Sequence, residues 1–141
     1  MKKLLILASF MLLATVVFSQ VTYSKDYLGN TVAKDQYGNV IATGSTDYLG
    51  NLVWKDQNGN VIKTESKDYL GNTVSKDSYG NTQSTQSTNY LGEKVEKDQY
   101  GNVLYTLKED YLGNIVKKDK YGNVMGTYKK DYLGNWVFYP N

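Results

Sequence analysis

Carboxylates and phenols are the side chains of this 141-residue chain that could do chemistry or bind a ligand. The chain has ten Asp, four Glu and 14 Tyr, but no His and no Cys. Without His, a serine or cysteine nucleophile lacks its usual general base, and without Cys there are no disulfides or thiolate metal sites. What remains is paired-carboxylate hydrolysis, binding of a hard cation by oxygen ligands, or stacking of phenol rings on a ligand.

Nearly every Asp holds the same place in a repeated phrase, Asp-x-x-Gly-Asn, which favours a structural role for the carboxylates. The phrase first appears at Asp26–Asn30 and Asp35–Asn39. A glycosidase-type hydrolase needs two carboxylates in one cleft with separated pKa values, and a calcium ion needs six or more oxygen ligands. Each phrase provides one carboxylate and one amide side chain. We therefore predict that the chain is not an enzyme and has no metal or cofactor.

The tyrosines form two rows, one in each kind of phrase. A row of rings with polar tips can stack on sugars or adhere to a surface, or it can pack against Leu and Val to thicken a thin core. Both interpretations stay open for each row. The candidate ligand-contact residues are Tyr27, Tyr48, Tyr69, Tyr90, Tyr111 and Tyr132 in one row, and Tyr37, Tyr79, Tyr100 and Tyr121 in the other.

The phrase that positions these side chains has the chemistry of a tight turn. Asp at the first position of a type I turn accepts hydrogen bonds from the amides ahead of it, and the Gly suits a left-handed position that closes a hairpin. A residue with a Cβ would cost roughly 1–2 kcal/mol in that conformation. The predicted turn glycines are Gly29, Gly38, Gly50, Gly59, Gly71, Gly80, Gly92, Gly101, Gly113, Gly122 and Gly134.

The fold class follows from a fixed interval of 21 residues between copies of Asp-Tyr-Leu-Gly-Asn. The segments between turns are short and rich in Val, Ile and Thr, without helical spacing of apolar residues. We predict an all-β repeat protein of 21-residue two-strand units, arranged as an antiparallel β-meander. Stacked units would place Val32 and its equivalents in one row and the turn leucines in another. The alternative is a single-coil β-solenoid, which would stack like charges at about 4.8 Å.

Residues 1–19 are predicted to be a secretory signal peptide, because two lysines precede the apolar run from Leu4 to Phe18. A membrane anchor is the alternative, although the run is short for a span. Residues 20–141 are predicted to form a single β-repeat domain, with five full units from 26 to 130 and a partial capping unit at 131–141. Pro140 in that unit suits a last, unpaired edge strand. The expected location is secreted or periplasmic, in a bacterium, with no integral membrane segment after cleavage.

The alternating phrases of Asp26–Asn135 resemble the tyrosine–aspartate (YD) repeats of large secreted bacterial proteins. The resemblance implies a long antiparallel sheet built from β-hairpins. In that family Tyr stands directly before Asp, whereas Lys, Thr or Glu holds that place here. The family's toxin-enclosing role needs a far longer chain and a cargo domain, so the resemblance extends to the sheet architecture alone.

The charge balance of residues 20–141 argues against nucleic acid, because 14 Lys face 14 Asp plus Glu and no Arg is present. We expect an exported, non-catalytic protein with a structural or adhesive role at the cell surface or extracellular matrix. Its partner there would be a glycan or a protein. Two other functions stay open: a carbohydrate-binding module that uses the Tyr rows, and a subunit that self-associates into β-fibres through open sheet edges.

Overall fold

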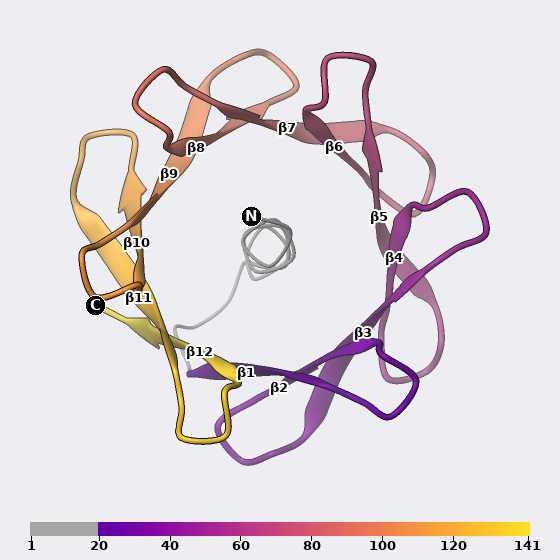
Figure 1. The fold of residues 1–141 in the computed structure, drawn as a ribbon. Coiled ribbons are helices and arrows are strands. Elements are labelled where there is room, and N and C mark those ends of the chain that lie inside the picture. The colour runs from indigo at the N-terminus through magenta and orange to yellow at the C-terminus, as the bar shows by residue number, and fades with distance from the viewer. Residues whose placement is uncertain (1–19) are drawn as a thin grey trace.

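The computed structural model describes residues 20–141, which fold into twelve antiparallel strands that close into a barrel (Figure 1). Each strand pairs with its neighbours in the sequence, and the first pairs with the last. The strands are β1 (Val21–Lys25), β2 (Thr31–Lys34), β3 (Val40–Thr46), β4 (Leu52–Lys55), β5 (Val61–Lys67), β6 (Thr73–Lys76), β7 (Thr82–Thr88), β8 (Lys94–Asp98), β9 (Val103–Glu109), β10 (Ile115–Asp119), β11 (Val124–Lys130) and β12 (Trp136–Pro140).

The predicted antiparallel meander is confirmed, and the solenoid alternative is wrong, because every pair of neighbouring strands runs antiparallel. The expectation of an open sheet is also wrong. Tyr23 pairs with Trp136 and Val21 with Phe138, which joins β1 to β12. Pro140 therefore does not mark an unpaired edge, since β12 has a partner on both sides. The fibre hypothesis relied on open edges, and the sheet of residues 20–141 has none.

Ten of the eleven turns are held by their own Asp and Asn, as the turn at Asp47 shows, and in the remaining turn Asn89 and Glu93 take these two places. One carboxylate oxygen, Oδ1, accepts hydrogen bonds from the amides of Leu49 and Asn51, each at 2.9 Å. The other, Oδ2, accepts one from Asn51 Nδ2 at 3.2 Å. All eleven turn glycines have φ between 81 and 88°, the left-handed region that a Cβ disfavours. The turn phrase is therefore a self-contained local structure.

The inner face of the barrel divides into an apolar and a polar part, because residues along a barrel strand alternate between inside and outside. The apolar part comes mainly from strands near the two ends of the chain: Tyr23, Ala33, Ala42, Trp54, Tyr105, Leu107, Ile115, Tyr128 and Phe138. The polar part comes from β5 to β8, with Lys63, Glu65, Thr73, Ser75, Ser84, Gln86 and Glu96, and from Lys117 of β10. This division has no counterpart in the regular repeat of the turns.

The predicted signal peptide, residues 1–19, lies outside the described residues. Within residues 20–141, no helix has the length and apolarity that a membrane crossing requires.

Candidate functional site: the Tyr–Leu rim

The two ends of the barrel carry different turns. Turns that follow odd-numbered strands lie at one end and turns that follow even-numbered strands at the other, because successive strands run in opposite directions. The first end, the Tyr–Leu rim, consists of the pairs Tyr27–Leu28, Tyr48–Leu49, Tyr69–Leu70, Tyr90–Leu91, Tyr111–Leu112 and Tyr132–Leu133. The second end, the polar rim, consists of the turns at 35–39, 56–60, 77–81, 98–102 and 119–123.

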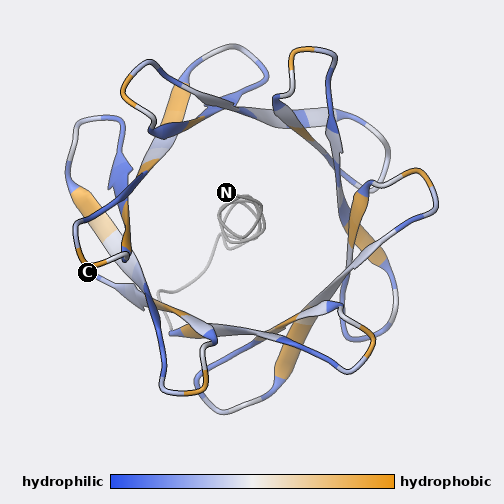
Figure 2. Ribbon diagram, viewed as in Figure 1, coloured by the Kyte–Doolittle hydropathy of each residue, from blue (hydrophilic) through white to orange (hydrophobic). Residues whose placement is uncertain are grey.

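Both rows of turn tyrosines are on the surface. The tyrosines of the Tyr–Leu rim are 94–95% exposed and its leucines 60–69%. Tyr37, Tyr79, Tyr100 and Tyr121 of the polar rim are 78–88% exposed. Residues coloured orange, as hydrophobic, recur at hairpin tips around the outer margin of the barrel (Figure 2). The turn tyrosines and leucines therefore do not thicken the core, and the buried tyrosines are strand residues outside both rows, Tyr23, Tyr105 and Tyr128.

The turn does not require Tyr or Leu at its two central positions. In the turn at Asp56 these positions hold Gln57 and Asn58, yet Oδ1 of Asp56 accepts from the amides of Asn58 and Asn60 at 2.9 Å. These distances match those at Asp47, whose turn contains Tyr48 and Leu49. The Gly amide donates to the Asp carbonyl at 3.1 Å in both turns. Tyr and Leu are thus additions to a turn that folds without them.

The turn carboxylates are committed to the turn itself. The hydrogen bond from the Asn51 backbone amide is the largest influence on the pKa of Asp47 and lowers it. Desolvation raises this pKa by less, and the hydrogen bond from the Asn51 side chain lowers it further. The same bonds at Asn39 lower the pKa of Asp35. These oxygens are largely used inside each turn, and residues 20–141 contain no group of three or more His, Cys, Asp or Glu placed to hold a metal ion.

Two positions of the 21-residue repeat show opposite behaviour: the exposed Tyr–Leu pair is constant, and one buried strand position varies. The Tyr–Leu pair is the same in all six copies. One inner position, which is at most 2% exposed in every copy, is occupied by six different residues: Ala33, Trp54, Ser75, Glu96, Lys117 and Phe138. Packing usually restricts buried positions more than exposed ones. Since the turn needs neither Tyr nor Leu, the six exposed and repeated pairs make this rim the candidate contact surface of residues 20–141.

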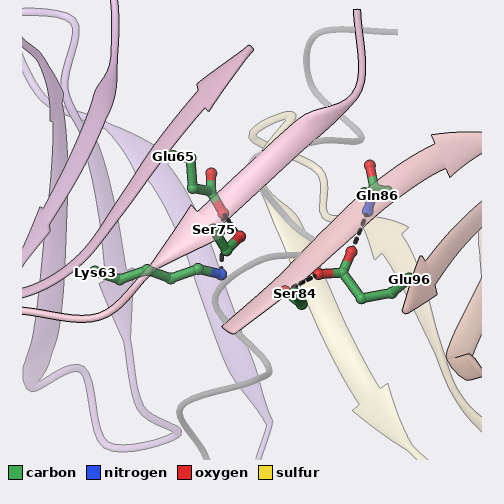
Figure 3. Close-up of polar contacts among 6 residues, drawn as sticks. All are labelled: Lys63, Glu65, Ser75, Ser84, Gln86 and Glu96. Carbon is green, nitrogen blue, oxygen red and sulfur yellow. Dashed lines mark hydrogen bonds and ion pairs between the residues drawn. The ribbon is translucent and has the colours of Figure 1, made fainter. Parts of the chain in front are cut away.

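A cluster of buried polar residues lies inside the barrel, on β5 to β8 (Figure 3). Lys63 Nζ is 3.0 Å from Glu65 Oε1, which also accepts a bond from Ser75 Oγ at 3.4 Å. Glu96 accepts hydrogen bonds from Ser84 Oγ and from Gln86 Nε2. These residues do not stand out in the sequence, because strand alternation alone does not tell which face of a strand points inward.

Burial dominates the electrostatics of this cluster. It raises the pKa values of Glu65 and Glu96 and lowers that of Lys63, in each case against the opposing effect of the neighbouring charges and donors. Lys117 lies 3.9 Å from the centre of the Tyr105 ring, and burial lowers the pKa of Lys117 to about 8. Shifted pKa values can mark an active site, but buried structural charges show the same shifts. Residues that are at most 4% exposed and that pair with one another fit the structural role.

The polar rim has an open groove of about 660 Å³ between the turns that follow β8 and β10. It combines an aromatic ring and an apolar floor with carboxylates, an amide and an ammonium group. Its lining residues are Asp98, Asn102, Val103, Leu104, Asp119, Lys120 and Tyr121. The sequence analysis had placed Tyr121 in a candidate row but did not predict a groove beside it.

Comparison with known proteins gives a likeness of fold alone. No family model matches the chain, and no curated protein matches it. The barrel is similar to the X-ray structure of a protein from Arabidopsis thaliana, with a TM-score of 0.67 and 16% sequence identity over 87% of this chain and 80% of that one. The resemblance to tyrosine–aspartate repeats is not tested by these comparisons and stays a prediction.

Proposed function

We propose that this chain is an exported, non-catalytic barrel protein that adheres to a cell surface or matrix through its Tyr–Leu rim. The observation that supports this most is the ring of six identical Tyr–Leu pairs, with Tyr 94–95% and Leu 60–69% exposed. Large exposed aromatic and apolar side chains are typical of interaction sites. Export rests on the basic and apolar sequence of residues 1–19.

Adhesion by many equal contacts suits this arrangement better than a single deep site. Each pair offers a modest contact area, but a barrel fixes the six pairs relative to one another. After one pair has bound, the others act at high effective concentration, so weak contacts add to strong attachment. A closed sheet also supports this role, because it presents the turns without free strand edges that would pair with other chains.

Adsorption of the full chain to surfaces coated with polysaccharide, protein or lipid tests this function. In the test variant, Gln-Asn replaces Tyr-Leu in all six turns of the rim, since Gln57 and Asn58 already fit the same turn. We expect adsorption to fall at least about tenfold, because the loss at each turn multiplies across the rim. The matched control changes the four polar-rim tyrosines to Asn and should adsorb like the wild type. Equal adsorption by wild type and test variant would contradict the proposal.

A carbohydrate-binding module is the second candidate function, and the groove on the polar rim favours it. The Tyr121 ring is 78% exposed and can stack on a sugar face, while Asn102 and Lys120 border the same groove and can bond hydroxyl groups. Saturable binding on a glycan array, lost in Tyr121→Ala but kept in Tyr37→Ala, would support this function. Binding that is unchanged in Tyr121→Ala would exclude the groove as the sugar site.

A further inference from the structure

We propose that the partner of the Tyr–Leu rim is a lipid bilayer surface, into whose headgroup region the six turns insert. This inference rests on the proposed function, because both use the same rim. It adds the chemistry of the partner, which the exposed side chains themselves specify.

The groups that the rim leaves for a partner are amphipathic and carry few directional hydrogen bonds. In the turn at Asp26, the carboxylate already accepts from the amides of Leu28 and Asn30 at 2.9 Å and from Asn30 Nδ2 at 3.0 Å. The exposed remainder is a phenol and an isobutyl group. A phenol ring with a polar tip suits the headgroup level of a membrane, and a Leu side chain suits the boundary with the acyl chains.

Leucine is the residue that separates a lipid partner from a sugar or a polar surface. On the polar rim, the residue beside Tyr is Gln36, Ser78, Gln99 or Lys120, so a turn tyrosine needs no apolar neighbour. On the Tyr–Leu rim, Leu accompanies Tyr in all six turns. Six leucines that are 60–69% exposed gain free energy only where water is removed from them. A sugar face would leave most of that apolar surface in water.

The arrangement of the turns fits a flat and extended partner. All six turns end at the same end of a closed barrel, and they are spread around its circumference (Figure 1). A single peptide or a small ligand would contact one or two of these turns. A bilayer surface can contact all six at once, and each inserted turn then strengthens the attachment of the others.

The cations near the rim do not indicate binding by charge. Lys25 and Lys67 each donate to a Thr hydroxyl of their own hairpin at 2.8 Å, and each stands next to a turn Asp. Across residues 20–141, Lys and acidic residues balance. Attachment should therefore come from apolar insertion, so that zwitterionic phosphatidylcholine, which has no net charge, is sufficient and added salt has little effect.

Flotation of the full chain with phosphatidylcholine vesicles tests the inference. The test variant changes all six rim leucines to Asn and keeps the tyrosines, and far-UV circular dichroism checks that it folds. We expect its partition coefficient to fall at least about tenfold, in line with the loss of buried apolar area. The control changes Tyr37, Tyr79, Tyr100 and Tyr121 to Asn and should float like the wild type. All variants keep residues 1–19, so differences between them report on the turns.

Three results would overturn the lipid partner. The first is flotation that is equal in the wild type and the leucine variant. The second is binding that requires anionic lipid and disappears when salt is raised. The third is adsorption of the wild type to polysaccharide or protein surfaces without flotation, which would leave the proposed adhesive function in place. A wild-type protein that adsorbs to none of the tested surfaces, including the vesicles, would in contrast contradict the proposed adhesive function as well.

Discussion

The inner face of the barrel and its Tyr–Leu rim differ in how far their residues repeat from one 21-residue unit to the next. At the rim, all six copies have Tyr and Leu. At the equivalent inner position the residues range from Ala33 through Glu96 to Trp54, and every copy is at most 2% exposed. The difference shows that repetition in this chain is not a mark of burial. Inner residues are adapted to their individual neighbours, whereas the uniform rim residues are exposed and, under the proposed function, form the contact surface.

The adaptation inside the barrel is visible where a large residue meets a glycine. A Cβ on Gly44 would lie 3.0 Å from the Trp54 ring, and one on Gly126 would lie 2.3 Å from the Phe138 ring. These are the two glycines outside the turn phrases. Inner substitutions should therefore change the free energy of unfolding strongly, in a direction that depends on the specific neighbours, whereas rim substitutions should change it little.

The largest effect is expected at the buried ion pair. Lys63→Met should lower the free energy of unfolding by about 3–5 kcal/mol, because it leaves the Glu65 carboxylate buried without its cation. Urea denaturation measures this loss. The double variant Lys63→Met and Glu65→Met should recover part of it, since the Glu65 charge is then removed together with its partner, while Glu96 still loses the attraction of Lys63. A single variant as stable as the wild type would show that the pair is not needed inside the barrel.

A smaller loss of stability is expected when a side chain is added at Gly126, where the Phe138 ring packs. Gly126→Ala should lower the free energy of unfolding by about 2–3 kcal/mol, because the new methyl group overlaps the Phe138 ring. Adding Phe138→Leu should restore part of the loss by removing that ring. Thermal unfolding of the single and double variants measures the coupling, and additive effects would contradict a direct contact.

Lys117 should show a gain in stability on losing its charge. Its folded pKa, about 8, lies below the ordinary lysine value, so the unfolded chain holds the proton more tightly. Wild-type stability should therefore rise as pH increases from about 8 to about 10.4. Lys117→Met should stabilise by about 1–2 kcal/mol at neutral pH, where the charged form is buried, and less at high pH.

The control for this pH dependence is Lys118→Met, which changes the adjacent, half-buried lysine on the other face of β10. It should have the same pH profile as the wild type. The groups facing Lys117 are Glu96, which raises its pKa, and Lys63, which lowers it, but burial is the largest influence. A gain from Lys117→Met that is constant from neutral to alkaline pH would show that lost charge is not its cause.

The sequence was sufficient for the meander because turn chemistry is local. Asp, Gly and Asn at fixed spacing specify a hairpin within five residues, and Gly29 and its ten equivalents adopt the expected left-handed φ. Closure was not predictable from this pattern. It depends on pairing β1 with β12 across the whole chain, and β1 precedes the first turn phrase, where no repeated signal marks a strand.

The inner face was not predictable either. The valine that is constant in each short strand suggested a core row, but the fully buried row is the variable position that follows it. The constant valine is half-buried in four units, as at Val32 and Val53, and buried in the other two, whereas its variable neighbour, such as Ala33 or Trp54, is buried in every unit. The candidate rows of turn tyrosines were identified from the sequence. Their exposure on both rims was not, because the same Tyr pattern suits packing and adhesion equally.

The smallest effect on stability is expected at the rim. Replacing Tyr48 by Gln and Leu49 by Asn should change the free energy of unfolding by no more than about 0.5 kcal/mol, because both side chains are exposed. The turn at Asp56 already has this pair and the same hydrogen bonds. Urea denaturation of this single-turn variant measures the change. Asp47→Ala is the positive control, because it removes the hydrogen bonds that hold the turn.

A loss above about 1 kcal/mol from the Tyr48 and Leu49 change would mean that folding itself keeps the pair uniform, beyond what an ordinary surface substitution costs. The contrast between rim and interior would then be one of packing, and the case for an outside partner would weaken. An unchanged free energy of unfolding, combined with lost adsorption, would instead separate the two regions by their roles. Folding would then depend on the varied inner residues, and attachment on the six uniform pairs.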